Sequence, residues 1–252
     1  MHARRVRLLF LLLITVLIFA CFKLPYFQNV LFKDTAEEAA EQAVEDIACV
    51  GEKIVYNVML GNLSIGSSEY RFLKKTELNG RPVNLITFYT KLARFSDRET
   101  IYSDPKTFLP FLVERKISKL IKQERIREEY DQENFVLTII RKRWNTKKTV
   151  IKKDKPIHNP VLLPYFVRNN ANLNLGWTFE VNFPKREYKI ELKSIEDVKV
   201  PAGEFKAYYF ESEPPQIKIW ISKDARRIPL KIEGTGVLGY KLVMKEYSIE
   251  AE

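Results

Sequence analysis

The side chains that commonly carry catalysis are scarce in this sequence of 252 residues. It contains two histidines, and because His2 lies in the N-terminal leader, His158 is the only imidazole of the folded part. No nucleophile elbow of the GxSxG type accompanies His158, so we interpret it as a loop residue. The two cysteines, Cys21 and Cys49, form neither a disulfide framework nor a metal-binding cluster. This inventory argues against zinc chemistry and histidine-based acyl transfer, and it predicts no cofactor and no metal site.

Neighbouring carboxylates are the remaining groups with which the chain could do acid–base chemistry. They occur at Glu128-Glu129 with Asp131, and at Glu196-Asp197. Because adjacent side chains of a strand point to opposite faces, these carboxylates do not converge by themselves. We therefore expect solvated strand faces at these positions, and the sequence predicts a protein that is not an enzyme.

The densest basic run covers residues 141–155 and contains eight Lys or Arg residues against one acid, Asp154. The candidate residues for binding an anionic surface are Arg141, Lys142, Arg143, Trp144, Lys147, Lys148, Lys152 and Lys153. A basic hairpin with an interfacial Trp suits anionic lipid headgroups or other polyanions of the cell envelope. The alternative is a solvated hairpin whose lysines keep a sheet edge from aggregating. Nucleic acid is not an expected partner, because the leader described below indicates export, and the sequence identifies no protein partner.

Aromatic side chains offer a second candidate binding surface. Tyr208, Phe210 and Trp220 fall on alternating strand positions that can share one face. If the sheet curls, its concave side would hold an acyl chain or another apolar ligand against these rings. The alternative is that the three rings fill the core.

The first 33 residues carry the signals that place this chain at a membrane. Three arginines among the first seven residues precede an apolar run at residues 8–22. That run is short for a membrane span, which needs roughly twenty residues, and typical of a signal peptide. The sequence IFAC that ends at Cys21 resembles a bacterial lipobox, which makes Cys21 a lipidation candidate. The alternatives are an uncut membrane anchor and, least favoured, a cleaved signal peptide, and we predict a domain on the periplasmic side of the bacterial cell envelope.

Residues 34–49 are predicted to form an acidic helical spacer between this segment and the domain. Thr35 and Glu38 have the spacing of a capping box, and the alanines and glutamates that follow favour a helix. The leader also explains half of the formal net charge of +10, because residues 1–33 contain five basic groups and no acid. The remainder has 37 basic and 32 acidic residues, which further weakens a nucleic-acid interpretation.

Residues 50–252 show the short alternating segments and turn signals of an all-β domain. The predicted strands are residues 53–60, 63–74, 82–93, 109–119, 123–131, 135–144, 147–153, 177–183, 187–200, 205–211, 217–222, 228–232 and 236–249. A short helix is expected to start near Pro160, and Pro164 is expected to bend or end it. The absence of long helices between the strands argues against a parallel α/β sheet. We predict a strongly curved antiparallel meander that is either open or closed into a barrel.

The same region resembles the bacterial family known as domain of unknown function 3108. The resemblance is carried by Val50-Gly51-Glu52-Lys53 with Tyr56, Ile65-Gly66, Asp104-Pro105 with Leu109-Pro110, Tyr165-Phe166-Val167-Arg168, Leu175-Gly176, Val200-Pro201-Ala202-Gly203-Glu204-Phe205, and Ile219-Trp220-Ile221-Ser222 through Asp224 to Ile228-Pro229. It spans residues 50 to about 247 and implies an exported β-rich domain. The family brings no agreed activity, so it implies no catalytic residue.

These patterns predict a membrane-tethered extracytoplasmic domain that binds a lipidic or anionic component of the cell envelope without catalysing a reaction. The first alternative is a structural or interaction module of an envelope assembly. The second, which the inventory of side chains favours least, is an unrecognised hydrolase.

Overall fold

The computed structural model describes residues 50–170, 173–234 and 240–250 of the chain. The chain divides into two compact units, residues 1–45 and residues 46–252, and every element described below belongs to the second unit. The predictions for residues 1–33, for Cys21 and for the spacer at residues 34–49 lie outside the described residues. Within the described ranges, no helix combines the length and the apolar composition that a membrane span requires.

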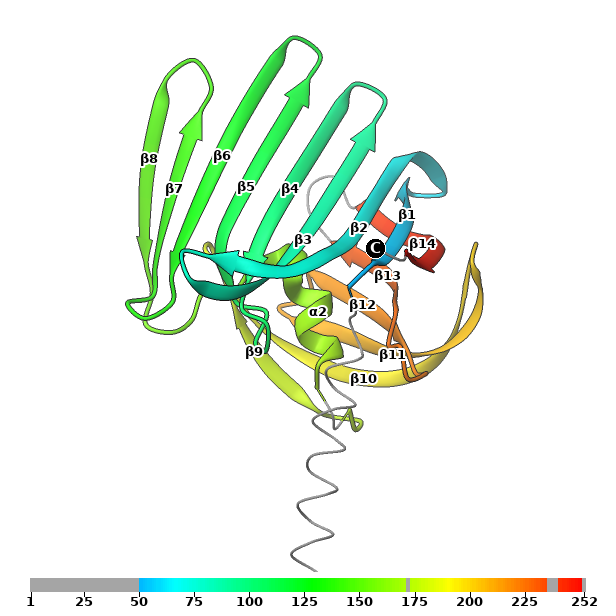
Figure 1. The fold of residues 1–252 in the computed structure, drawn as a ribbon. Coiled ribbons are helices and arrows are strands. Elements are labelled where there is room, and N and C mark those ends of the chain that lie inside the picture. The colour runs from blue at the N-terminus through cyan, green and yellow to red at the C-terminus, as the bar shows by residue number, and fades with distance from the viewer. Residues whose placement is uncertain (1–49, 171–172, 235–239, 251–252) are drawn as a thin grey trace, which may run out of the picture. The chain divides into compact units, whose positions relative to one another are not determined.

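The described part of the chain consists of fourteen strands and two short helical segments (Figure 1). The N-terminal half of the sheet contains β1 (Glu52–Leu60), β2 (Leu63–Leu78), β3 (Arg81–Leu92), β4 (Phe95–Ser103), β5 (Pro110–Lys119), β6 (Lys122–Asp131), β7 (Val136–Lys142) and β8 (Thr146–Lys152). The 3₁₀ helix η1 (Pro160–Leu162) and the α-helix α2 (Leu163–Arg168) follow. The C-terminal half contains β9 (Thr178–Asn182), β10 (Glu187–Val200), β11 (Gly203–Glu213), β12 (Ile217–Ser222), β13 (Pro229–Gly234) and β14 (Tyr240–Ile249).

All fourteen strands form one antiparallel sheet, which confirms the predicted meander. From β1 to β8 and from β9 to β14, strands that follow each other in sequence are neighbours in the sheet, and β1 also pairs with β14. The first and last strands therefore lie in the middle of the sheet, while β8 and β9 form its two edges. Six strand pairs contain a register shift, which increases local twist and bends the strands. The sheet is strongly curved but does not close.

The segment between β8 and η1 joins the two edges of the sheet without forming a strand. The backbone N–H of His158 donates to the carbonyl of Asn182 at the end of β9 (2.8 Å). The Asn182 amide in turn donates to the carbonyls of Lys155 (3.1 Å) and Pro156 (3.2 Å). These bonds satisfy backbone groups that would otherwise remain unpaired at an open edge. His158 lies in a loop, as predicted, and burial lowers the pKa of its imidazole.

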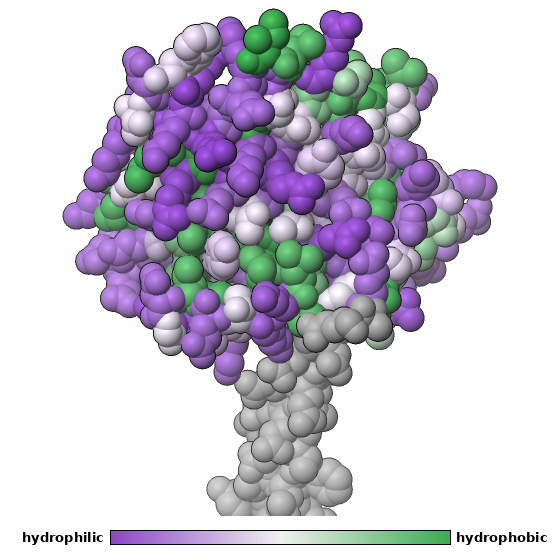
Figure 2. All heavy atoms as spheres, turned by 45° about the horizontal axis from the view of Figure 1, so that its top comes forward, coloured by the Kyte–Doolittle hydropathy of each residue, from purple (hydrophilic) through white to green (hydrophobic). Residues whose placement is uncertain are grey.

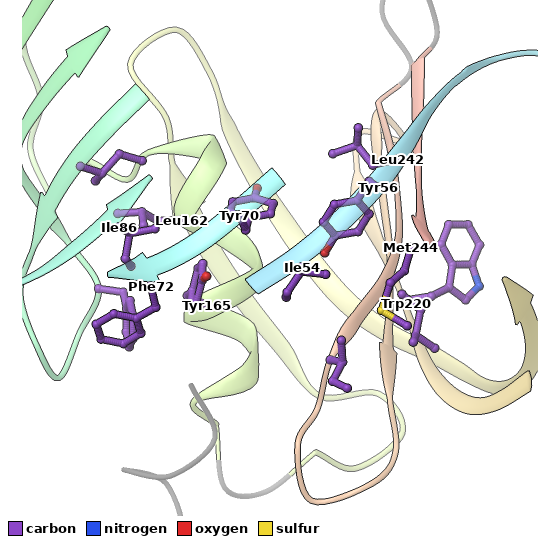
Figure 3. Close-up of a cluster of buried hydrophobic side chains, with 14 of the residues drawn as sticks. Ile54, Tyr56, Tyr70, Phe72, Ile86, Leu162, Tyr165, Trp220, Leu242 and Met244 are labelled. Atoms are coloured by element: carbon purple, nitrogen blue, oxygen red, sulfur yellow. The ribbon is translucent and has the colours of Figure 1, made fainter. Parts of the chain in front are cut away.

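The inner face of the sheet, which is the face that α2 covers, carries the hydrophobic core (Figure 3). Leu162 and Tyr165 pack into a cluster formed mainly by β1 to β5, in which Tyr165 stacks on Phe108 with the ring centroids 5.4 Å apart. Leu163 and Val167 pack into a second cluster formed mainly by β9 to β12. The helical segment therefore fills the space between the two halves of the curved sheet.

Two details of the sequence-based prediction were wrong. The strand β4 was not among the predicted strands, because its inward positions include Asp97 and Glu99 where the pattern requires apolar residues. Pro164 lies in the first turn of α2 instead of ending a helix. Proline is tolerated there because the N–H that it lacks has no partner inside the helix at that position.

Candidate binding site on the inner face of the sheet

The most deeply buried charges belong to an ion pair that joins α2 to β1. Arg168, in the last turn of α2, donates from both terminal nitrogens to the Glu52 carboxylate at 2.7 and 2.8 Å, and both side chains are inaccessible to solvent. Arg168 also donates to the backbone carbonyl of Arg226 (2.9 Å), in the turn between β12 and β13. Burial alone would lower the pKa of Arg168, but the Glu52 carboxylate raises it, so the guanidinium stays charged.

Segments that carry the family resemblance meet at this ion pair. Glu52 and Tyr56 come from the first motif, Arg168 from the helical motif, and Pro229 from the last. The hydroxyl of the fully buried Tyr56 donates to the carbonyl of Pro229 (2.8 Å). Since the charged groups bind each other and are closed to solvent, we interpret this cluster as a structural joint.

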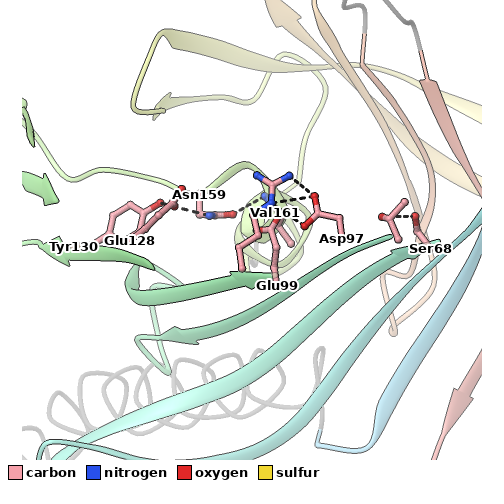
Figure 4. Close-up of polar contacts among 9 residues, drawn as sticks. Ser68, Asp97, Glu99, Glu128, Tyr130, Asn159 and Val161 are labelled. Atoms are coloured by element: carbon pink, nitrogen blue, oxygen red, sulfur yellow. Dashed lines mark hydrogen bonds and ion pairs between the residues drawn. The ribbon is translucent and has the colours of Figure 1, made fainter. Parts of the chain in front are cut away.

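A second polar cluster lies on the inner face of β4, β5 and β6 and is only partly covered (Figure 4). Arg115 donates to Asp97 from its Nε at 2.8 Å, and the same nitrogen lies 3.4 Å from the carboxylate of Glu99. On the next strand, the Tyr130 hydroxyl donates to Glu128 (2.7 Å). We call these five residues the inner polar cluster. Asn159, the N-cap of η1, extends it by a 3.5 Å contact to the Tyr130 hydroxyl.

The inner polar cluster has more acids than bases, and this shifts its proton equilibria. Burial raises the pKa of the Glu99 carboxyl to about 7, and the neighbouring Asp97 and Glu128 carboxylates raise it while Arg115 lowers it. With its pKa raised this far, Glu99 is expected to change its charge near neutral pH. No group of three or more His, Cys, Asp or Glu side chains within the described ranges is arranged to hold a metal ion.

The expectation that Glu128-Glu129 lies on a solvated strand face was wrong for one of the two residues. Glu129 faces outward and pairs with Arg127 (2.7 Å). Glu128 faces inward, where it is half-buried beside Tyr130. Alternation separates the pair as expected, but the inward carboxylate meets acids of another strand that are far away in the sequence.

An apolar crevice of about 110 Å³ lies beside the inner polar cluster, where η1 and α2 face both halves of the sheet. Its walls are formed by Tyr70, Phe88, Pro160, Val161, Leu163, Pro164, Ile217, Ile219, Ile232, Glu233, Gly234, Tyr240 and Leu242. Phe88 is the direct partner of Glu99 in the pairing of β3 with β4, which places the carboxylate next to this wall. Burial of the hydroxyl end of Tyr240 raises its pKa, and the charge of Glu99 adds to this rise although half of the residue is exposed.

The arrangement suits an amphipathic ligand whose apolar end enters the crevice while its polar end meets the inner polar cluster. Pockets for drug-sized ligands have volumes of roughly 300–1,000 Å³. The crevice, at 110 Å³, is smaller and fits the end of an acyl chain. A larger hollow of 520 Å³ on the outer face of β5 to β7 has a mixed lining of apolar residues, such as Phe111 and Val136, and of charged residues that pair with each other, such as Arg127 with Glu129.

The three aromatic candidates do not share one face. Trp220 pairs with Tyr209 across β11 and β12, and their rings stack with the centroids 4.8 Å apart. Tyr208 and Phe210 lie on the opposite, inner face together with Ile219 and Ile221. Phe210 is fully buried in the core, as the alternative interpretation held. Phe210 does not line the crevice, but its cross-strand neighbour Ile219 does.

Strands β7 and β8 divide the basic candidates between the two faces of a hairpin. Arg141 and Lys147 form a cross-strand pair on the inner side, and Arg141 binds Glu124 (3.1 Å). Lys142, Lys148 and Lys152 are exposed on the outer side, and Arg143 and Trp144 lie at the tip. Lys153 leaves the hairpin and lies 3.9 Å from Glu187 of β10, across the open ends of the sheet. The face on which each of these basic residues lies, and the acid that it meets, depend on the folded sheet. The local sequence therefore could not distinguish the inward residues from the outward ones.

The residues of the crevice gave no signal in the sequence. They come from β2, β3, β12, β13, β14 and the helical segments, and apart from Glu233, Gly234 and the two prolines each is an ordinary aliphatic or aromatic residue of its own element. Asp97 and Glu99 could have been found only as polar residues at inward positions of a strand, and that strand was not predicted.

Comparisons with known proteins agree with this fold. Residues 55–245 match the family described as "Protein of unknown function (DUF3108)". Among solved structures, a beta-barrel-like protein of domain of unknown function DUF1849 from Brucella abortus is similar with a TM-score of 0.51 and 11% sequence identity, over 80% of this chain and 98% of that one. A comparison with curated proteins gave no match.

Two further structures are more distant. One is a candidate exported protein with a YmcC-like fold from Bacteroides fragilis, with a TM-score of 0.31 and 10% identity, covering 79% of this chain and 96% of that one. The other is a candidate lipoprotein from Parabacteroides distasonis, with a TM-score of 0.25 and 12% identity over 79% and 96% of the two chains.

Proposed function

The chain belongs to the DUF3108 family, whose description names no activity, and we propose that it is an extracytoplasmic, non-catalytic binding domain for an amphipathic lipid of the cell envelope. The observation that carries this proposal is the apolar crevice directly beside the partly covered inner polar cluster. The arginine-flanked apolar run at residues 8–22 supports the location outside the cytoplasm.

The charge of the cluster indicates which headgroup the site would prefer. Asp97, Glu99 and Glu128 outnumber Arg115 on the inner face. An ammonium group near these carboxylates would be favoured by charge, and Arg115 could bind a phosphate of the same headgroup. Phosphatidylethanolamine carries both groups, and its acyl chain would supply the apolar end for the crevice.

The arrangement of the charged groups supports binding without catalysis. Asp97 binds the Nε and one terminal nitrogen of Arg115, and Glu128 accepts the hydroxyl of Tyr130, so these two carboxylates are occupied as acids or bases while Arg115 keeps further N–H donors for a phosphate. A general acid or base needs a free position within hydrogen-bond reach of the reacting atom. Glu99 is the group of the cluster whose charge responds to pH near neutrality, and we assign it to ligand recognition.

Mass spectrometry of lipids extracted from the natively purified full chain tests the proposal. We expect a phospholipid to accompany the wild-type protein and to be lost when Ile232→Trp fills the crevice. Leu242→Phe is a milder variant of the same wall, for the case that the larger side chain prevents folding, which circular dichroism would reveal. Ile195→Trp, at an exposed position of β10, is the matched control and should retain the lipid. Wild-type protein without lipid, or equal lipid in the folded crevice variants, would contradict the proposal.

A further inference from the structure

Three consecutive hairpins of the N-terminal half end on one side of the sheet, away from α2 (Figure 1). They are β3–β4, β5–β6 and β7–β8. We call their ends, residues 91–96, 116–123 and 141–148, the rim. A backbone hydrogen bond from Leu120 to the carbonyl of Arg94 (3.2 Å) ties the first two ends together. Lys119 lies over the ring of Phe95, 5.9 Å from its centroid, and adds a second link between them. The first two ends therefore form one surface, and β6 pairs with β7 up to Arg125 and Lys142, next to the third end.

Large apolar side chains protrude from the ends of two of these hairpins. Leu120 is 72% exposed and Ile121 is 94% exposed at the end of β5–β6, and Trp144 is 80% exposed at the end of β7–β8. Figure 2, which turns this side toward the viewer, shows hydrophobic side chains as small groups within a mainly hydrophilic surface. Large apolar side chains that are this exposed and that gather at the ends of neighbouring hairpins mark a candidate interaction surface.

The charges of the rim have a single sign. Its three segments contain ten Lys or Arg residues and no Asp or Glu. These basic residues are Lys91, Arg94, Lys116, Lys119, Lys122, Arg141, Lys142, Arg143, Lys147 and Lys148. Arg141 is partly neutralised by Glu124. Even so, the surface around the apolar side chains is strongly basic, and its complement is an anionic surface.

We propose that the rim docks on an anionic lipid bilayer, with Leu120, Ile121 and Trp144 inserted at the level of the headgroups. Trp is favoured at that level because its ring is amphipathic, and exposed aliphatic side chains gain by leaving water. Lys and Arg residues beside them meet the negative surface potential of anionic lipids. The chain position supports a bilayer as the occupant, because the apolar run at residues 8–22 is followed by this domain. The surface is separate from the crevice, so the inference goes beyond the proposed lipid-binding function.

Flotation of the full chain with vesicles, combined with fluorescence quenching, tests this inference. Vesicles of phosphatidylglycerol and phosphatidylcholine would carry bromine on their acyl chains, which quenches a Trp that enters the bilayer. We expect the floated protein to be quenched, and Trp144→Phe to remove most of that quenching. Because flotation by residues 1–33 alone would not quench Trp144, the experiment separates docking of the rim from attachment by the N-terminus.

Two sets of variants identify the forces involved. Replacing Leu120 and Ile121 by Ser should strongly reduce quenching of Trp144, whereas Leu175→Ser with Ile195→Ser, two exposed positions of the C-terminal half, should leave it unchanged. Replacing Lys119, Lys122 or Arg143 by Gln should each weaken docking on anionic vesicles about fivefold. Vesicles of phosphatidylcholine alone should give little quenching.

The inference would be overturned if Trp144 stayed unquenched in floated wild-type protein, or if the control pair reduced quenching as much as Leu120 and Ile121. Failure of the proposed lipid-binding function has a different signature. In that case the purified protein carries no lipid, while the quenching of Trp144 on anionic vesicles is unaffected by Leu242→Phe.

Discussion

The two buried polar clusters of this domain differ in the balance of their charges. Glu52 and Arg168 are both inaccessible and bind each other, so their contribution is to join β1 to α2. Asp97 and Glu99 are also buried, but they share one Arg115 and lie beside a crevice that opens to solvent. The charges of Glu52 and Arg168 neutralise each other. In the inner polar cluster the acids outnumber the single Arg115, so the cluster can still bind a cation or a proton.

Removing Arg168 tests the structural joint. We expect Arg168→Met to lower the free energy of unfolding by about 3–5 kcal/mol, because it leaves the Glu52 carboxylate buried without its cation. Adding Glu52→Leu should recover much of this loss, since apolar replacements of a buried ion pair are often neutral. Urea denaturation measures both. Lys199→Met is the control, because Lys199 and Glu204 form a pair whose side chains are 83% and 72% exposed. A double variant as unstable as Arg168→Met would contradict the explanation.

Glu99 should make the stability of the domain depend on pH. Burial, with the acids Asp97 and Glu128 against Arg115, raises its pKa from 4.5 to about 7 in the folded state. Between these values the folded state holds a proton that the unfolded state releases, so the contribution of Glu99 to stability is largest below pH 4.5 and is lost as pH rises through 7. The change is on the order of 3 kcal/mol.

Comparing unfolding of the wild type and of Glu99→Gln between pH 4.5 and 8 isolates this contribution. The variant should lose the part of the slope that Glu99 causes. Glu114→Gln, at an exposed outward position of β5, is the matched control and should keep the wild-type slope. Parallel slopes for wild type and Glu99→Gln would show that this carboxyl does not titrate in the expected range.

At the scale of elements, the sequence predicted strands wherever one face is regularly apolar. β1 is such a case, because Ile54, Tyr56 and Val58 are all buried on one side. β4 was missed because acids occupy two inward positions, and the crevice could not be found because its walls come from elements far apart in the sequence. Local patterns specify an element, but the contacts between elements depend on a register that only the folded sheet shows.

The edge strand β8 offers a test of the solubility interpretation of the basic run. β8 pairs only with β7 among the described strands, and its outward lysines oppose pairing with another chain. We expect Lys148→Val with Lys152→Val to promote association, detected by size-exclusion chromatography and light scattering. Lys189→Val with Lys206→Val, in strands that have a neighbour on both sides, should remain as the wild type. Equal association in both pairs would mean that hydrophobicity, not the free edge, is responsible.

At the scale of the whole molecule, pairing of β1 with β14 makes the described part of the domain one continuous sheet with its first and last strands in the middle. The curvature and the antiparallel order were predicted from strand spacing, and the position of the opening was not. It lies between β8 and β9, where a loop held by Asn182 replaces strand pairing. Residues 46–252 form a compact unit that contains this whole sheet, and we expect the unit to fold without the residues before it.

Residues 1–33 are the segment that we expect to hold the chain at a membrane. We expect the full chain to fractionate with membranes, because residues 8–22 are apolar and follow three arginines. A chain that begins at residue 34 should be folded. If only the rim holds this shortened chain at membranes, high salt should release it, because salt screens charges beyond roughly 10 Å at 0.1 M. Labelling with palmitate, compared with Cys21→Ser, would separate a lipoprotein from an uncut anchor. Should the shortened chain resist extraction by salt as firmly as the full chain, the first 33 residues would not be the anchor, and the attachment would belong to the domain itself.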